Sequence, residues 1–108
     1  MALTSTVNFP NNVLRLANGT FLEDGTAVAL KIVVGFKPKY VRVVNETSRD
    51  GYEWFEGMAD AEAVKFVAAG TRTIITTLGI TPAADGFTVG LDLDVNVVNE
   101  QISWIALG

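Results

Sequence analysis

Histidine and cysteine are both absent from the 108-residue sequence. The chain therefore lacks the side chain that most often carries protons at neutral pH, the thiol nucleophile and any disulfide. It also lacks the residue types that most often bind zinc and other transition metals. These absences exclude cysteine and histidine-based catalysis, and we expect no catalytic residue, no cofactor and no metal ion.

Positive charge is scarce as well, with eight Lys and Arg against twelve Asp and Glu and a net charge of −4. Nucleic acids and anionic membranes bind proteins that present clustered Lys and Arg. We therefore expect neither nucleic acid nor membrane as a partner. The longest apolar run, residues 27–36, is interrupted by Lys31, and it is far shorter than the roughly 20 residues of a membrane span.

The sequence does contain short apolar runs separated by Gly, Pro, Asn and Asp, for example at Asn18-Gly19, Asp24-Gly25 and Asp85-Gly86. The dipeptides Asp24-Gly25 and Asp85-Gly86 are typical of tight turns. Runs of this length between turn signals are typical of β-sandwiches and barrels. The sequence predicts an all-β, single-domain β-sandwich or jelly-roll-like barrel of about eight short antiparallel strands.

Alternation of side chains supports the predicted strands. In residues 27–34, Val28, Leu30, Ile32 and Val34 share one face. The same period of two occurs in residues 40–44, 63–66, 93–97 and 101–106. Residues 59–69 also fit a helix capped by Asp60, but Phe66-Val67 and the terminal Gly70 favour a strand.

Several predicted strands are apolar on both faces. Aromatic side chains alternate onto both sides of residues 52–56, and Val33, Val44 and Ile105 occupy positions where a solvated face favours polar residues. A second sheet or loops within the domain would cover such faces, and so would further copies of the chain. The second alternative predicts a homo-oligomer.

Residues 1–12 differ from the rest, because they are polar with Val7 and Phe9 as apolar anchors and Pro10 near the end. They are predicted to form an N-terminal arm that reaches a neighbouring molecule, or a first edge strand. Residues 13–108 are predicted to form the single β domain.

The triplet Asp92-x-Asp94-x-Asn96 matches the opening of an EF-hand calcium loop. Val97 and Ser103 stand where that loop needs Gly and Glu, so the match fails at two critical positions. Alternation instead predicts that the three polar side chains share the solvated face of a strand.

Two other chemistries are conceivable from the residues. The acidic residues Glu46, Asp50, Glu53, Glu56, Asp60 and Glu62 offer carboxylates for glycoside hydrolysis, although acids near turns are usually solvated. Tyr52, Trp54 and Phe55 offer platforms for stacking on sugars, although large aromatic residues in strands more often belong to a core or an interface.

Six phrases of the sequence, taken in order, resemble a group of small tailed-bacteriophage virion proteins of the head-decoration (cement) type. The resemblance covers about residues 28–107, and none of its phrases is a catalytic signature. The phrases are residues 35–45 (GFKPKYVRVVN), 53–58 (EWFEGM), 70–73 (GTRT), 79–81 (GIT), 86–90 (GFTVG) and 96–106 (NVVNEQISWIA).

The resemblance implies a non-enzymatic structural protein on the capsid surface of a virion, made in the host cytoplasm. It implies binding to the major capsid protein and self-association, often as a homotrimer. A receptor-binding or carbohydrate-binding module at a tail tip is the alternative. The residues predicted to make partner contacts are Phe9, Phe36, Lys37, Lys39, Tyr40, Arg42, Trp54, Phe55 and Trp104.

Overall fold

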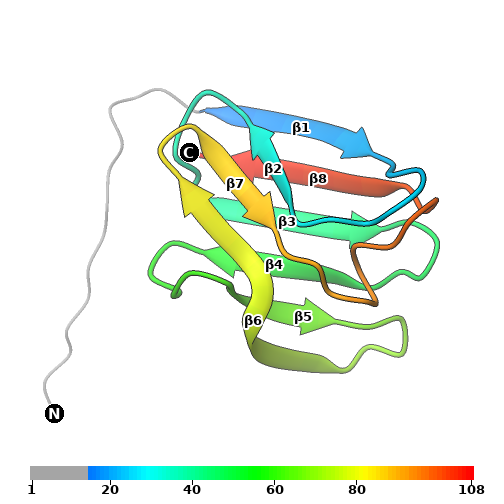
Figure 1. Ribbon diagram of the computed structural model, residues 1–108. Helices are drawn as coiled ribbons and strands as arrows, with labels where there is room; N and C mark the ends of the chain where they lie inside the picture. Colours follow the sequence, from blue (N-terminus) through cyan, green and yellow to red (C-terminus); the bar gives the residue numbers. More distant parts are fainter. Residues whose placement is uncertain (1–14) are drawn as a thin grey trace, which may run out of the picture.

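The computed structural model describes residues 15–108, and every regular element in this part is a strand (Figure 1). The strands form one antiparallel sheet in the order β1-β8-β3-β4-β5-β6-β7-β2. This confirms the predicted all-β domain of eight antiparallel strands. The strands are β1 (Leu16–Phe21), β2 (Leu30–Val33), β3 (Tyr40–Asn45), β4 (Gly51–Phe55), β5 (Glu62–Phe66), β6 (Arg72–Ala83), β7 (Gly86–Val89) and β8 (Ile102–Leu107).

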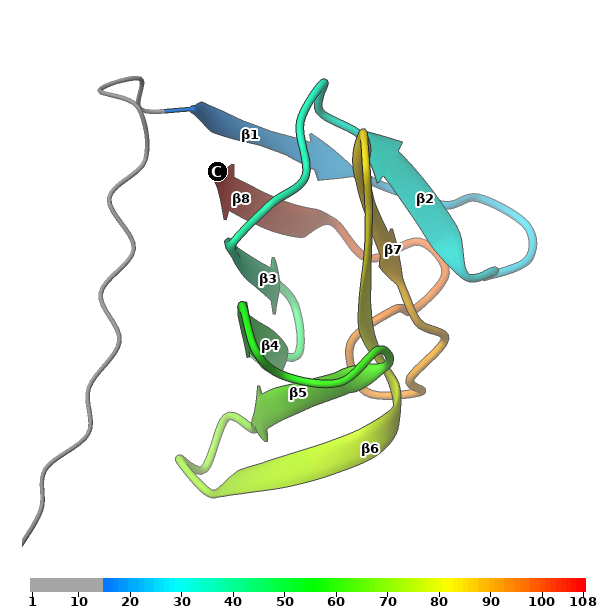
Figure 2. The ribbon, with the colours of Figure 1, turned by 90° about the vertical axis from the view of Figure 1, so that its left-hand side faces the viewer.

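The sheet curls because the long strand β6 changes partner along its length. Its first part pairs with β5 and its last part with β7. Between the two parts the ladder is irregular, since the neighbours Glu62 and Ala63 face Ile80 and Ile75, which are not adjacent. An irregularity of this kind bends a strand. The strands β7 and β2 therefore lie across the concave side of the wall formed by β1, β8, β3, β4 and β5 (Figure 2).

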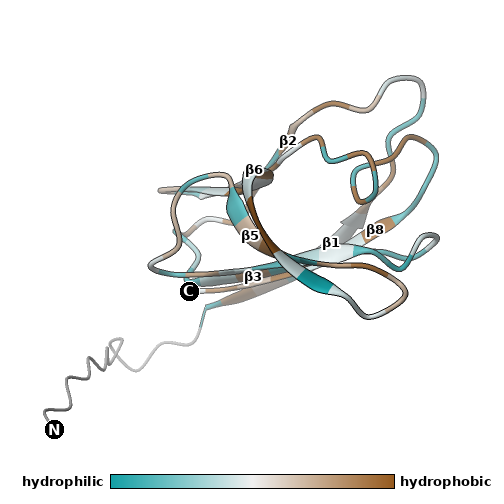
Figure 3. Ribbon diagram, turned by 90° about the horizontal axis from the view of Figure 1, so that it is seen from below, coloured by the Kyte–Doolittle hydropathy of each residue, from teal (hydrophilic) through white to brown (hydrophobic). Residues whose placement is uncertain are grey.

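The core fills the inside of this half-barrel. Hydrophobic and hydrophilic residues follow one another along the surrounding strands (Figure 3). Trp104 of β8 packs edge-on against Phe87 of β7, with ring centres 5.5 Å apart, and so joins the wall to the strands opposite. The same indole lies over Gly19 of β1, where a Cβ atom would be 2.9 Å from the ring. Other core residues are Val41, Val43, Tyr52, Ala63, Ile80, Val89, Val95, Ile102 and Ala106.

Residues 93–97 form turns, so the strand predicted there is wrong. The side chain of Asp92 stabilises the turn locally, and the side chain of Asn96 joins this segment to the residues ahead of β2. Asp92 Oδ1 accepts a hydrogen bond from the backbone N–H of Asp94 (2.9 Å), and Asn96 Nδ2 donates to the carbonyl of Val28 (2.8 Å). The predicted solvated face is wrong too, because Asp92 and Asn96 are buried.

The strand predicted in residues 59–69 is confirmed as β5, without a helix. No helix in residues 15–108 is long and apolar enough to cross a membrane. The strand predicted in residues 27–34 is shorter than expected, since only β2 joins the sheet. Ahead of it, the backbone N–H of Val28 donates to Glu23 Oε2 (2.8 Å) rather than to a neighbouring strand.

Both dipeptides predicted as tight turns lie at chain reversals. Gly25 adopts a positive φ of 98° within a bend. Ala84 and Asp85 form the turn between β6 and β7, and Gly86 is the first residue of β7. Gly86 is needed there because the backbone of Ile32 on β2 occupies the space of a Cβ atom.

The predicted N-terminal arm or edge strand, residues 1–12, lies outside the described residues, and so does Phe9.

Candidate binding surface

The convex side of the wall continues onto the first part of β6, which pairs with β5. We call this surface the outer face, and it carries side chains in rows that cross the strands. One row runs from β1 to β6 and contains Asn18, Ile105, Arg42, Glu53, Val64 and Ile74. On one side of it lies a row made of Leu16, Leu107, Tyr40 and Phe55. On the other side lies a row made of Thr20, Ser103, Val44, Gly51, Phe66 and Arg72.

Glu53 lies at the centre of the outer face, and three polar side chains approach its carboxylate. The Tyr40 hydroxyl donates to Glu53 Oε2 (2.8 Å), and Arg72 Nη1 lies 3.4 Å from Oε1. Arg42 Nη1 is 3.9 Å from Oε2. Burial raises the pKa of Tyr40 above its ordinary value, and the hydrogen bond to Glu53 and the charge of that carboxylate add to the rise.

Phe66 supports both arginines from below. The guanidinium carbons of Arg42 and Arg72 lie 5.2 Å and 5.4 Å from the centre of its ring, which is within the range of cation–π attraction. Phe66 itself is buried, whereas both arginine side chains are about half exposed (45% and 59%). The guanidinium groups are therefore positioned and still accessible to a partner.

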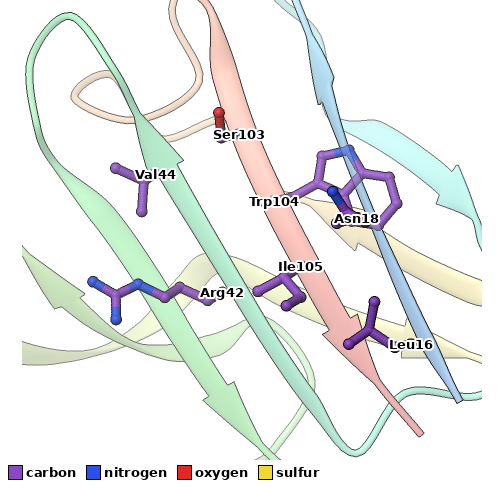
Figure 4. A pocket seen from close by; sticks show the side chains of 7 residues that line it. All are labelled: Leu16, Asn18, Arg42, Val44, Ser103, Trp104 and Ile105. Carbon is purple, nitrogen blue, oxygen red and sulfur yellow. The ribbon is translucent and has the colours of Figure 1, made fainter.

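A shallow hollow of about 330 Å³ lies on the same face, over β1, β8 and β3 (Figure 4). Arg42 lies at one side of it and Leu16 at another, with Ile105 between them in the view of Figure 4. The remaining lining residues are Asn18, Val44, Ser103 and Trp104.

Large apolar side chains surround this polar centre. Leu16 is 52% exposed, Phe55 is 48% exposed and Ile74 is 56% exposed. The Phe55 ring packs against Tyr40 with ring centres 5.3 Å apart. Arginine, tyrosine and exposed apolar residues in one area are typical of protein-binding surfaces. The outer face is therefore the best candidate for a functional site in the described residues.

Three of the predicted contact residues meet on the outer face: Tyr40, Arg42 and Phe55. Lys37 and Lys39 lie just before β3. The side chain of Lys37 is exposed. The backbone of Lys39 joins neighbouring segments, because its N–H donates to the carbonyl of Leu107 (2.7 Å) and its carbonyl accepts the N–H of Glu56.

Phe36 and Trp54 are only 7% and 3% exposed and belong to the core, so they leave the set of candidate contact residues. Their aromatic side chains fill the half-barrel, a role that the sequence pattern does not distinguish from an interface role. Trp104 is partly buried and packs against the core, although it also lines the hollow.

Of the three aromatic residues that the sequence offered for stacking on sugars, Tyr52 and Trp54 are both buried, whereas Phe55 is exposed. The Tyr52 hydroxyl donates to the carbonyl of Leu78 (2.9 Å), and burial raises its pKa far above the ordinary value. Neither buried ring presents a face to solvent for a sugar.

Four of the six acidic residues considered for hydrolysis have separate partners in the described residues. Glu46 accepts hydrogen bonds from Ser103 and from Gln101 (3.1 Å), and these bonds lower its pKa. Asp50 and Glu62 each accept a backbone N–H. Glu53 contacts Tyr40, Arg42 and Arg72 on the outer face, and Glu56 and Asp60 are exposed.

The calcium-like triplet is engaged by a lysine. Lys65 Nζ donates to Asp92 Oδ1 (3.0 Å) and Asp94 Oδ2 (2.7 Å), so an ammonium group occupies the space near these carboxylates. Burial lowers the pKa of Lys65, but the hydrogen bonds and charges of Asp94 and Asp92 outweigh burial and raise it overall. In residues 15–108, no group of three or more Asp or Glu residues is arranged to hold a metal ion.

Several residues of the outer face were not identified from the sequence, namely Leu16, Phe66, Arg72 and Ile74, and Glu53 was considered only as an acid for hydrolysis. Their grouping depends on which strands are neighbours, and a single sequence does not reveal that. Val44 and Ile105 are exceptions. The sequence already indicated that they occupy an unusually apolar outer side of their strands, because apolar residues alternate onto both faces of β3 and β8.

A second hollow of about 270 Å³ lies between the loop after β1 and the loop before β8, on the side opposite the outer face. It is lined by Ala27, Leu91, Leu93, Asn96, Val97 and Val98. Leu93 at its rim is 84% exposed, and it provides a comparison site for the outer face.

Comparison of the chain with protein-family models, curated proteins and solved structures found no match.

Proposed function

We propose that the protein is a non-enzymatic virion structural protein of a tailed bacteriophage that binds the major capsid protein as a homo-oligomer and stabilises the capsid. The observation that carries the proposal is the outer face, with its exposed apolar residues around Arg42 and Arg72. The phrases that resemble decoration proteins add support, since residues 35–45, 53–58 and 96–106 contribute to the adjacent strands β3, β4 and β8.

The outer face also indicates the chemistry of the partner. Within residues 15–108, Arg72 has one long contact to Glu53, so most of its donors are left for a further acceptor. A capsid surface that offers carboxylates beside apolar side chains would satisfy both parts of the outer face. Burying apolar area there contributes roughly 25 cal/mol per Å² before the costs of association.

Binding to capsids tests the proposal. Purified protein is mixed with empty capsids from a phage strain that lacks this gene, and the bound fraction is measured by co-sedimentation. We expect saturable binding. Ile74→Lys, which places a charge in the apolar part of the outer face, is expected to weaken binding at least about tenfold.

Leu93→Lys is the matched control, because it also replaces an exposed apolar residue by lysine but lies on the opposite side of the molecule. It is expected to bind like the unmodified protein, and both variants are to melt at similar temperatures. The proposal is wrong if the unmodified protein does not bind capsids, or if both variants bind equally well.

A further inference from the structure

The strand β1 forms one edge of the sheet, and its outer side is not paired with any strand in residues 15–108 (Figures 1 and 2). At its start Arg15 N–H donates to Gly108 (3.4 Å), and Gly108 N–H donates to Arg15 (2.9 Å). Hydrogen-bonding direction alternates along an antiparallel strand. The backbone groups of Leu16, Asn18 and Thr20 therefore point away from β8, toward the free edge.

This edge lacks the usual protection against pairing. Edge strands are normally blocked by charges, proline or a bulge, but β1 (Leu16–Phe21) contains no charged residue and no proline, and its register with β8 is regular. Leu16 at its start and Leu22 directly after its end are 52% and 54% exposed. The alternation of exposed and half-buried residues continues through Leu22, so both leucines project to the outer face.

The sequence around β1 is complementary to itself when it is read in the opposite direction. Residues 15–23 read RLANGTFLE, with Gly19 at the centre. When two copies pair antiparallel about Gly19, each Leu16 faces Leu22 of the other copy and each Asn18 faces Thr20. The facing residues have their backbone N–H and C=O groups directed toward each other, as an antiparallel ladder requires.

The charges at the two ends are complementary in the same register, because each Arg15 faces Glu23 of the other copy. Arg15 is exposed and makes no ion pair within residues 15–108. Glu23 uses Oε2 to accept the N–H of Val28, while its Oε1 is buried without a hydrogen-bond partner in the described part of the chain. Pairing of two copies would place a guanidinium group beside this carboxylate, which has no ion-pair partner in residues 15–108.

We propose that β1 pairs with β1 of a second copy, antiparallel about a two-fold axis at Gly19, and joins the two sheets into one. The contact buries Leu16 against Leu22 and places Arg15 beside Glu23, twice in each dimer. The proposal rests on the homo-oligomeric part of the proposed function and replaces the threefold arrangement that the resemblance implies. It does not depend on binding to capsids.

Sedimentation equilibrium of the full chain tests the two-fold contact, and charge reversal tests its register. We expect the unmodified protein to form a dimer. The double variant L16K/L22K places lysine opposite lysine at both ends and is expected to raise the dimer Kd at least about tenfold. The matched variant L16K/L22E places lysine opposite glutamate and is expected to dimerise more tightly than L16K/L22K.

Cysteine cross-linking provides an independent measure, because the chain contains no cysteine of its own. Oxidised N18C/T20C is expected to form covalent dimers, since the two positions face each other and Cα atoms of such pairs lie about 5.5 Å apart. The single variant N18C is expected to remain largely monomeric on a non-reducing gel.

A monomer or a trimer of the unmodified protein, equal Kd values for L16K/L22K and L16K/L22E, or equal cross-linking of N18C and N18C/T20C overturns the two-fold contact. Capsid binding is measured separately, so a dimer that ignores capsids would contradict the proposed function and leave this contact intact.

Discussion

Glu53 determines how the polar side chains of the outer face are arranged, because Tyr40, Arg42 and Arg72 all approach its carboxylate. Each of these residues lies on a different strand from Glu53. The charged centre is therefore a product of strand pairing, and the sequence spacing of these residues does not reveal it.

Replacing this carboxylate is expected to change the titration of Tyr40. In the variant Glu53→Gln the carboxylate charge disappears, so the pKa of Tyr40 is expected to fall toward its ordinary value while burial keeps it above that value. Ultraviolet absorbance of tyrosinate between pH 8 and 12 measures the change. Tyr52 is the internal control, because burial is the main cause of its raised pKa. An unchanged first titration step contradicts the assigned role of Glu53.

A second prediction at this scale concerns Gly19. Gly19→Ala places a Cβ atom 2.9 Å from the indole of Trp104, which forces the ring to move. We expect the free energy of unfolding to fall by about 1–3 kcal/mol, as for other overpacked sites. Thr20→Ala, on the exposed side of the same strand, is expected to change it by less than about 0.5 kcal/mol. Equal urea midpoints for the two variants would contradict this packing.

At the scale of elements, the loop between β7 and β8 depends on a buried asparagine at the end of β3. Asn45 Nδ2 donates to the carbonyl of Val95 (3.0 Å) and to Glu100 Oε1 (2.8 Å). Its Oδ1 accepts the backbone N–H groups of Thr47 and Ser48 (2.8 Å and 3.0 Å). One side chain thus connects the β3–β4 turn to the loop that precedes β8.

Asn45→Ala is expected to lower the free energy of unfolding by roughly 2–4 kcal/mol, because it removes these bonds and leaves buried backbone groups without partners. Urea denaturation measures the loss. Thr47→Ala, in the same turn but exposed, is expected to cost less than about 0.5 kcal/mol. A small loss for Asn45→Ala would show that the loop is held by other contacts.

The sequence predicts some elements well and others poorly for physical reasons. The strands β3 and β8 are predictable, because their alternation of side chains persists in the sheet. Residues 93–97 alternate in the same way, yet Asp92 accepts the N–H of Asp94 and Asn96 donates to Val28, and these hydrogen bonds stabilise turns in place of a strand. The change of partner along β6 is not predictable, since it depends on pairing between residues distant in sequence.

At the scale of the whole molecule, three groups have raised pKa values in the folded chain: Tyr40, Tyr52 and Lys65. Each group holds its proton more tightly when folded than when unfolded. The resulting stabilisation is complete below the unfolded pKa values, about 10 for Tyr and 10.4 for Lys, and is lost as the pH rises through the folded values.

We therefore expect the free energy of unfolding to decrease as the pH rises from about 10. Urea denaturation at pH 8, 9.5 and 11 measures this dependence. Tyr52→Phe removes the most strongly shifted group and is expected to reduce the decrease between pH 9.5 and pH 11. Equal stability of the unmodified protein at pH 8 and pH 11 contradicts the account.

For the whole molecule, composition and alternation predict the fold class, whereas the proposed function depends on one face of a sheet whose members come from six strands. The sequence predicted Tyr40, Arg42 and Phe55 as contact residues, and the structure places them together on that face. The sequence did not distinguish the core residues Phe36 and Trp54 from these three residues, because aromatic side chains occur in both cores and interfaces.

The most direct test of the central claim is a cryo-electron microscopy map of capsids that lack this protein and have been saturated with it. We expect additional density at regular positions on the head lattice, with the outer face of β3, β4 and β6 against the capsid protein. A lattice without additional density, or density only at the tail, would contradict the account.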